Sequence, residues 1–306
     1  MIGSFDRIGF ARHSRRFRPG ELDVDLSGRL CLVTGGNAGL GRAAAEALAT
    51  RGASVQLLCR DAVRGETARD EIRRSTGNRR VELAVVDVSD LAAIRRWVDE
   101  AQLSAVHVLV HNAGLLPSRR SLTADGLELT FATHVVGPHL LTSLLGTPLR
   151  AAGDARVIFV SSGGMYTQRL DLEDLRWERR DYDGVVAYAR TKRMQVVLAG
   201  QWARVFASTA VSVYSMHPGW ADTSGVRTSL PRFYQVTRRL LRTPEQGADT
   251  IVWLAARQPA PVPSGGFWFD RQARAKHYLP WTREDPAAGE GLWAECQRLA
   301  GLQRSA

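Results

Sequence analysis

Short apolar runs alternate with helix-like segments along most of this chain. The runs occupy residues 29–34, 53–60, 81–88, 105–114, 155–162, 211–219 and, late in the chain, 265–271. The segments between them have helical spacing, as in 40–52, 62–77, 91–102 and about 125–150. Nearly continuous apolar runs indicate parallel strands buried on both faces, and helical connections imply right-handed crossovers. We therefore predict an α/β fold with a doubly wound, Rossmann-like parallel sheet.

The same pattern predicts one domain. A chain of 306 residues with 44% hydrophobic content can bury one large core. Neither an internal repeat nor a Pro/Ser-rich linker interrupts the alternation, so we place the domain at residues 21–302, with a substrate-loop region at about 220–245. Residues 1–20 form a separate basic extension.

This extension carries five Arg against one Asp, interleaved with bulky apolar side chains. Such a segment either lies at an anionic membrane surface or packs on the protein's own surface. Asp6, Arg7 and Arg12 interrupt any apolar stretch of a secretory signal. We expect a cytoplasmic protein, with peripheral membrane contact through the extension as an open alternative.

The net charge of +10 does not by itself indicate a nucleic-acid partner. The arginines are spread through the predicted helices and mixed with acidic residues, which is typical of a solvated surface. Cys31, Cys59 and Cys296 lack metal-ligand spacing, so we predict reduced thiols and no metal site.

A glycine-rich turn, Thr34-Gly-Gly-Asn-Ala-Gly-Leu-Gly41, joins the first strand to the first helix. Glycines permit positive φ and let backbone amides approach a pyrophosphate, which the helix N-terminus then stabilises. Its position at the first crossover predicts a dinucleotide site.

Cofactor choice is predicted at the end of the second strand. Arg60 is placed to bind a ribose 2′-phosphate, and Asp61 is one residue too late for the acidic role that favours NAD. We expect NADP preference, with NAD use and a merely surface-exposed Arg60 as alternatives.

Tyr188 and Lys192 stand one helical turn apart, and Lys192 is one of only two lysines among 41 basic residues. A lysine kept in such an arginine-rich chain suggests a role that a guanidinium cannot fill. A nearby ammonium favours the phenolate, so we expect Lys192 to lower the pKa of Tyr188 for acid–base catalysis. The alternative is an exposed i,i+4 pair.

The ordered motifs, TGGNAGLG, Asp87-Val88, Asn112-Ala113-Gly114, Ser161-Ser162, Tyr188-x-x-x-Lys192 and Pro218-Gly219, resemble those of the short-chain dehydrogenase/reductases over about residues 28 to 225. The gap between Ser162 and Tyr188 is similar to that of retinol-dehydrogenase-like members. The resemblance implies Ser162, Tyr188 and Lys192 as catalytic residues, with Ser162 preferred to Ser161 by motif register. It implies cofactor contacts for Gly35, Asn37, Gly39, Leu40, Gly41, Arg60, Asp87, Val88, Asn112, Ala113, Gly114, Tyr188, Lys192, Pro218, Gly219 and Thr223.

Two residues depart from the family pattern. His134 stands where the family usually has an Asn that anchors a proton-relay water; a histidine can hold a water with different reach and a titratable ring, so His134 is a further candidate catalytic residue. Pro138 follows within the same helix, where it should remove a backbone bond and bend the helix. Both put the relay, and dimerisation through this helix, in doubt. They leave open a nucleotide-binding sensor or scaffold with little catalysis.

We predict an NADP-dependent oxidoreductase acting on a carbonyl/alcohol pair. Met165, Tyr166 and Trp220 are the candidate substrate residues. Their apolar and aromatic side chains suit a lipophilic small molecule such as a steroid, retinoid or fatty aldehyde, although they could equally belong to the core.

Overall fold

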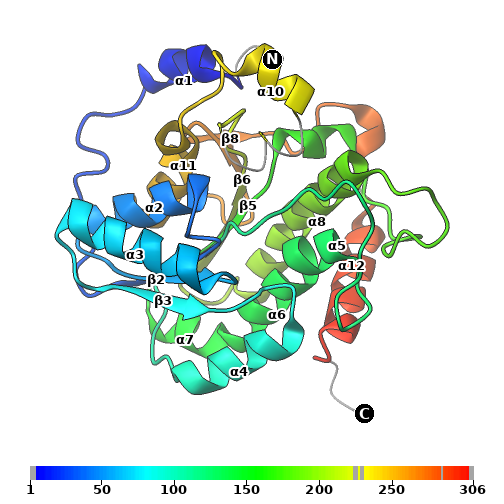
Figure 1. Cartoon of the computed structure of the whole chain (residues 1–306), viewed down its shortest axis with the longest axis horizontal. Helices are drawn as coiled ribbons and strands as arrows, with labels where there is room; N and C mark the ends of the chain where they lie inside the picture. The colour runs from blue at the N-terminus through cyan, green and yellow to red at the C-terminus, as the bar shows by residue number, and fades with distance from the viewer. Residues whose placement is uncertain (1–4, 223–226, 228–230, 284, 303–306) are drawn as a thin grey trace.

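A computed structural model describes residues 5–222, 227, 231–283 and 285–302, and its centre is one eight-stranded sheet (Figure 1). The strand order is β3-β2-β1-β4-β5-β6-β7-β8. Neighbouring strands are parallel except β7 and β8, which are antiparallel. The strands are β1 (Leu30–Thr34), β2 (Ser54–Cys59), β3 (Val81–Val85), β4 (Val108–His111), β5 (Ala155–Val160), β6 (Val211–Met216), β7 (Phe267–Phe269) and β8 (Gln272–Arg274). The predicted doubly wound fold is confirmed, with β8 as an addition.

Helices cover both faces of the sheet (Figure 1). One core layer packs α2 (Gly39–Thr50), α3 (Ala62–Thr76) and α11 (Pro244–Ala256) against the strands. The other contains α4 (Leu91–Ala101), α6 (Gly137–Leu144), α7 (Gly146–Ala151), α8 (Gly184–Val205) and α12 (Pro286–Leu299). Short helical turns lie at η3 (Gly163–Thr167) and η4 (Pro280–Thr282).

The long helix expected from about residue 125 begins later and is divided. Glu128 caps its start by accepting from the backbone N–H groups of Thr130 and Phe131, so α5 (Leu129–Phe131) begins at residue 129. A π-helical turn, η2 (Ala132–Val136), separates α5 from α6. Because Gly137 has no side chain, the helix beside η2 can pack closely against the segment that follows β3. A Cβ at this position would lie 1.9 Å from the Val88 carbonyl oxygen.

The N-terminal extension packs on the protein's own surface where it is described. Helix α1 (Arg7–Ser14) lies near α10 (Pro231–Thr237), and the Arg7 amide donates to the Leu240 carbonyl at 2.8 Å (Figure 1). Beneath it, Arg242 and Asp270 form a fully buried bidentate ion pair, and His13 Nδ1 lies 2.6 Å from Asp270.

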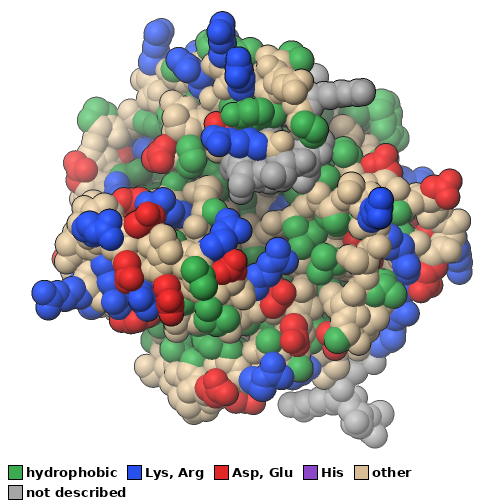
Figure 2. Space-filling model, viewed as in Figure 1, with side chains coloured by type: hydrophobic (Ala, Val, Ile, Leu, Met, Phe, Trp, Pro, Cys, Tyr) green, Lys and Arg blue, Asp and Glu red, His purple; other side chains and the backbone are tan. Residues whose placement is uncertain are grey.

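Charged side chains of both signs are mixed over much of the face seen in Figure 2, in agreement with the dispersed charge pattern of the sequence. Within the described ranges, no helix combines the length and apolar character needed to cross a bilayer.

Candidate active site

The glycine turn between β1 and α2 has a backbone that only glycine permits. Gly35 and Gly39 have φ of +66° and +52°. A Cβ on Gly35 would lie 2.9 Å from the Ala113 Cα, and one on Gly41 would lie 2.4 Å from the Gly35 carbonyl oxygen. The turn is thus fixed against the segment that follows β4.

The amides at the start of α2 can receive an anion. Ala38 occupies the N-cap and provides no side-chain hydrogen bond, whereas α3, α4 and α8 are each capped by an aspartate. First-turn amides without a side-chain partner are suited to a phosphate group. Asn37 and Leu40 are half-buried at this turn. These residues fit the pyrophosphate of a dinucleotide.

Asn112 and Ala113 link the turn to β4. The Thr34 hydroxyl accepts from both of their backbone amides at 3.0 Å, and Asn112 Nδ2 donates to the Thr34 carbonyl at 3.0 Å. Gly114 lies against His134, since a Cβ there would be 3.1 Å from its Nε2 atom. These contacts join the segment after β4 to the glycine turn and to His134, and the cofactor role of the three residues stays a prediction.

The residues expected at the adenosine end follow β2 and β3. Arg60 is exposed directly after β2. Asp61 is the N-cap of α3, and its carboxylate accepts from the Arg64 amide at 3.0 Å. This carboxylate therefore already has a structural role. Asp87 accepts from the Ser89 amide and hydroxyl, and Val88 is buried.

The two serines at the end of β5 have different surroundings. Ser161 is buried and donates to the Lys192 carbonyl at 2.7 Å, which ties β5 to α8. Ser162 is half-buried, and its side chain lies beside the Tyr188 phenol, whose pKa it lowers. Ser162 is therefore the serine that can share a substrate oxygen with Tyr188.

Burial controls the acidity of Tyr188 and Lys192. Burial raises the pKa of the Tyr188 phenol, and its hydrogen bond with Ser162 opposes this only in part. Burial lowers the pKa of Lys192 to about 7. Burial thus moves the pKa of Tyr188 in the direction opposite to that expected from Lys192, and the contribution that opposes burial comes from Ser162, while the lowered pKa of Lys192 weakens its own charge. The Lys192 Nζ lies 5.4 Å from the centre of the Tyr188 ring.

His134 lies in η2, beside Tyr188, with both ring nitrogens hydrogen-bonded. Its Nε2 accepts from the Leu115 amide at 3.1 Å, and its Nδ1 lies 2.8 Å from the Thr191 hydroxyl. Since the hydroxyl donates to the Tyr188 carbonyl, Nδ1 carries the proton and donates to Thr191. Burial, aided by Lys192, holds the pKa of His134 well below its usual range. The imidazole ring is therefore neutral, and both of its nitrogens take part in hydrogen bonds within the protein.

The residues expected at the nicotinamide and substrate end differ in how deeply they are buried. Pro218, Gly219 and Trp220 are half-buried after β6, and the Trp220 amide donates to the Phe5 carbonyl at 2.8 Å. Met165 and Tyr166 lie in a small core cluster. Thr223 lies outside the described residues, as do 224–226 and 228–230 of the expected substrate-loop region at about 220–245.

Met165 is fully buried, and the Tyr166 hydroxyl donates to the Ala275 carbonyl at 3.0 Å. In this structure they support the loop that carries Ser162, and their substrate role stays a prediction. Phe5 was not expected here: its ring lies 6.2 Å from that of Trp220 and packs against Gly163. The apolar residues interleaved in the extension were the only signal for it.

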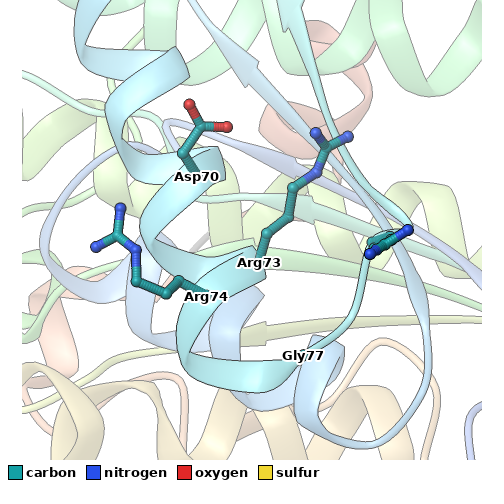
Figure 3. A pocket seen from close by; sticks show the side chains of 5 residues that line it. Asp70, Arg73, Arg74 and Gly77 are labelled. Carbon is teal, nitrogen blue, oxygen red and sulfur yellow. The ribbon is translucent and has the colours of Figure 1, made fainter.

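A separate hollow on the molecular surface is lined by Asp70, Arg73, Arg74, Gly77 and Arg79 (Figure 3). It lies at the end of α3 and the start of β3. This is the amino edge of the parallel strands, whereas the glycine turn, Ser162 and Pro218 follow their carboxyl ends. Dinucleotides bind outside the carboxyl edge in such folds, so this hollow is not the nucleotide site.

Comparison with known proteins places these motifs in context. A family model described as short chain dehydrogenase matches residues 29–173. The chain is 43% identical over 302 residues to human dehydrogenase/reductase SDR family member 12, covering 98% of this chain and 95% of that protein. It is 33% identical over 285 residues to human retinol dehydrogenase 12, covering 92% and 89%. Among solved structures, an uncharacterized protein from Mycobacterium paratuberculosis matches with a TM-score of 0.73 and 29% identity, over 91% of this chain and 95% of that one.

Proposed function

The chain belongs to the short-chain dehydrogenase/reductase family of oxidoreductases, and we propose that it uses NADP(H) to interconvert a carbonyl and an alcohol on a lipophilic small molecule. The observation that carries this proposal is the placement of the Ser162 side chain beside the Tyr188 phenol, with Lys192 one turn further along α8. The group lies on the same sheet edge as the glycine turn.

When bound, the nicotinamide supplies the hydride for carbonyl reduction or accepts it in alcohol oxidation. In reduction, Tyr188 donates its phenolic proton to the carbonyl oxygen, and Ser162 holds that oxygen in line with the phenol. An ordinary phenol has a pKa of about 10 and is protonated at neutral pH, and burial keeps Tyr188 in that form, as the acid role requires.

NADP preference is supported by the end of β2. Arg60 is exposed where the ribose 2′-phosphate of the cofactor would lie, and a guanidinium can bind a phosphate in a bidentate manner. Asp61, the nearest carboxylate in sequence, already caps α3. A ribose 2′-hydroxyl, the group that marks NAD, therefore lacks its usual acidic partner among these residues.

A lipophilic substrate is supported by aromatic side chains beside Ser162. Phe5 packs against Gly163, and Trp220 follows the Pro218-Gly219 turn. Apolar walls with few polar groups are typical of sites for lipophilic ligands. Human retinol dehydrogenase 12, a relative with 33% identity, bears the name of a lipophilic alcohol.

The test is a screen of NADPH oxidation against lipophilic aldehydes and ketones, with Tyr188→Phe as the blank. Loss of the proton donor should lower kcat by at least about a hundredfold while NADPH binding, followed by fluorescence, is retained. Tyr182→Phe is the matched control, because this hydroxyl bonds Glu128 outside the site and its loss should leave turnover intact. Equal turnover of Tyr188→Phe and the wild type would refute the proposal, and NADPH binding without any turnover would favour a sensor.

We also propose a cytoplasmic protein that touches anionic membranes through the outer face of α1. Three buried free cysteines accord with a reducing compartment. Ile8 is 63% exposed on α1, between exposed Arg7 and Arg12. Co-sedimentation with vesicles containing phosphatidylserine should fall for Ile8→Glu, a change that leaves the packed face of α1 intact; equal binding by both proteins would exclude this contact.

A further inference from the structure

Gln195 joins the catalytic lysine to the neighbouring helical segment. It is fully buried on α8, one turn after Lys192. Its Oε1 atom accepts from Lys192 Nζ at 3.1 Å, and its Nε2 atom donates to the backbone carbonyl of His134 at 2.9 Å. A single carboxamide thus connects the ε-amino group of Lys192 to η2.

Pro138 leaves the His134 carbonyl without its α-helical donor. The backbone bonds of η2 span five residues, as from the Gly137 amide to the Ala132 carbonyl. The helix α6 that follows returns to α-helical spacing, in which the carbonyl of residue 134 would accept from the amide of residue 138. Proline has no N–H group, so Pro138 removes this donor. A buried carbonyl without a partner is costly, and the Gln195 amide supplies the replacement.

The Lys192 amino group is held on two sides. Besides Gln195, it donates to the Val160 carbonyl at the end of β5, at 2.9 Å. An ammonium has three donors, which leaves a third to reach a cofactor ribose hydroxyl. Two titratable side chains from the packed elements face it: Tyr188 on the same helix and His134 on η2.

Neither ring nitrogen of His134 is left to hold a relay water in this structure. Both of its nitrogens are occupied by Leu115 and Thr191, and burial keeps the ring neutral. The contact that reaches Lys192 comes instead from the backbone of residue 134, through a carboxamide that does not ionise near neutral pH.

We propose that Gln195 is a positioning residue that fixes Lys192 by a direct side-chain bridge to the His134 carbonyl, in the place where the family pattern implies a relay water. This inference rests on the proposed oxidoreductase function. It assigns a shared role to Gln195 and Pro138: the proline frees the carbonyl, and the glutamine uses it to hold the lysine.

The first test measures Lys192 directly and needs no turnover. The chain has only two lysines, so protein labelled with 13C at lysine Cε should give two side-chain NMR signals, assigned with Lys276→Arg. In Gln195→Leu, loss of the acceptor disfavours the ammonium, and the pKa of Lys192 should fall by about one unit. His134→Asn keeps the backbone carbonyl and should leave the pKa within a few tenths of a unit of wild type.

A second variant preserves Gln195 itself. Pro138→Ala restores an N–H group that competes for the His134 carbonyl, so the pKa of Lys192 should shift in the same direction as in Gln195→Leu, by less. Gln201→Leu is the control, because this glutamine lies further along α8 and accepts from Arg204. The inference is overturned if the Lys192 titration in both Gln195→Leu and Pro138→Ala matches that of Gln201→Leu.

The second test uses the carbonyl reduction. Gln195→Leu should lower kcat by about tenfold and move the pH profile toward acid, with a smaller change in KM for the carbonyl substrate. A residue that only fills space would lower the melting temperature and leave kcat and the pH profile of the folded enzyme unchanged, which would also overturn the inference. If the wild type has no reductase activity, the NMR titration still decides the inference, so its failure is distinguishable from failure of the proposed function.

Discussion

The buried ion pair between Arg242 and Asp270 gives the sharpest prediction for stability. Each side chain is 1% exposed, and the two N–O distances are 2.6 and 2.9 Å. Arg242 also donates to the Asp6 and Pro218 carbonyls, so the pair joins the N-terminal extension to the segment after β6. Asp270→Asn is the appropriate change, since φ at this residue is +49° and asparagine tolerates the left-handed region.

Neutralising Asp270 leaves the Arg242 guanidinium buried without its counter-charge. Breaking a buried pair in this way costs about 3–5 kcal/mol, because the desolvation of the remaining charge is no longer offset. We expect Asp270→Asn to lower the free energy of unfolding by roughly 3 kcal/mol, the lower end, because the amide oxygen retains one acceptor. The loss should also expose the extension to trypsin at Arg12 and Arg15.

The assay is urea unfolding followed by tryptophan fluorescence, with Glu295→Gln as control. Glu295 pairs with Arg298 at the surface, where the two side chains are 31% and 52% exposed. Removing an exposed pair of this kind should change the free energy of unfolding by less than about 1 kcal/mol. If Asp270→Asn is no more destabilising than Glu295→Gln, the argument for a buried anchor is wrong.

Three further predictions concern the cofactor, the π turn and the lysine. Arg60→Asp should raise KM for NADPH at least about tenfold more than KM for NADH, and equal increases would remove the 2′-phosphate assignment. Gly137→Ala should lower the free energy of unfolding by about 3 kcal/mol, because its Cβ would meet a backbone carbonyl, whereas Gly146→Ala meets only the end of a flexible Arg150 and should cost less than about 1 kcal/mol; similar urea midpoints for the two would contradict this. Lys192 has a folded-state pKa of about 7, below its unfolded value, so its burial destabilises the protein fully below pH 7 and progressively less as pH rises. The stability of Lys192→Met relative to wild type should therefore be highest at and below pH 7 and should fall by about 1.4 kcal/mol per unit between pH 7 and 9; a pH-independent difference in urea unfolding would argue against a depressed pKa.

The parallel strands could be predicted because burial on both faces requires nearly continuous apolar runs, as in β5, where all six residues are buried. Strand β8 could not, since Gln272–Arg274 has no apolar pattern. Its pairing depends on the tight turn at Asp270 and Arg271, both with positive φ, which folds the chain back onto β7. Asp270 is a common turn residue but Arg271 is not, and the Asn-Gly or Asp-Gly pair that marks such a hairpin turn in a sequence is absent here.

The residues of the candidate site likewise include some that the sequence predicts and one that it does not. Ser162, Tyr188 and Lys192 follow from spacing within one strand end and one helix. Gln195 does not, because its partner is a backbone carbonyl 61 residues away, at a π-helical turn that the sequence did not predict. The effect of Pro138 on the helix could be predicted from the sequence, but the side chain that compensates for it depends on how α8 packs beside η2.

The use of lysine and arginine in the interior supports a special role for Lys192. Arg156 is fully buried and donates to the carbonyls of Leu254, Ala255 and Arg257 at the end of α11, and Arg242 similarly joins several acceptors. A rigid guanidinium suits these structural tasks, because it presents five donors and stays charged. Lys192 instead has a compact amino group whose pKa of about 7 lets burial and hydrogen bonds tune its charge near neutral pH. The buried lysine of this arginine-rich chain thus lies beside Tyr188. There, an amino group that can gain or lose a proton near neutral pH can take part in acid–base chemistry.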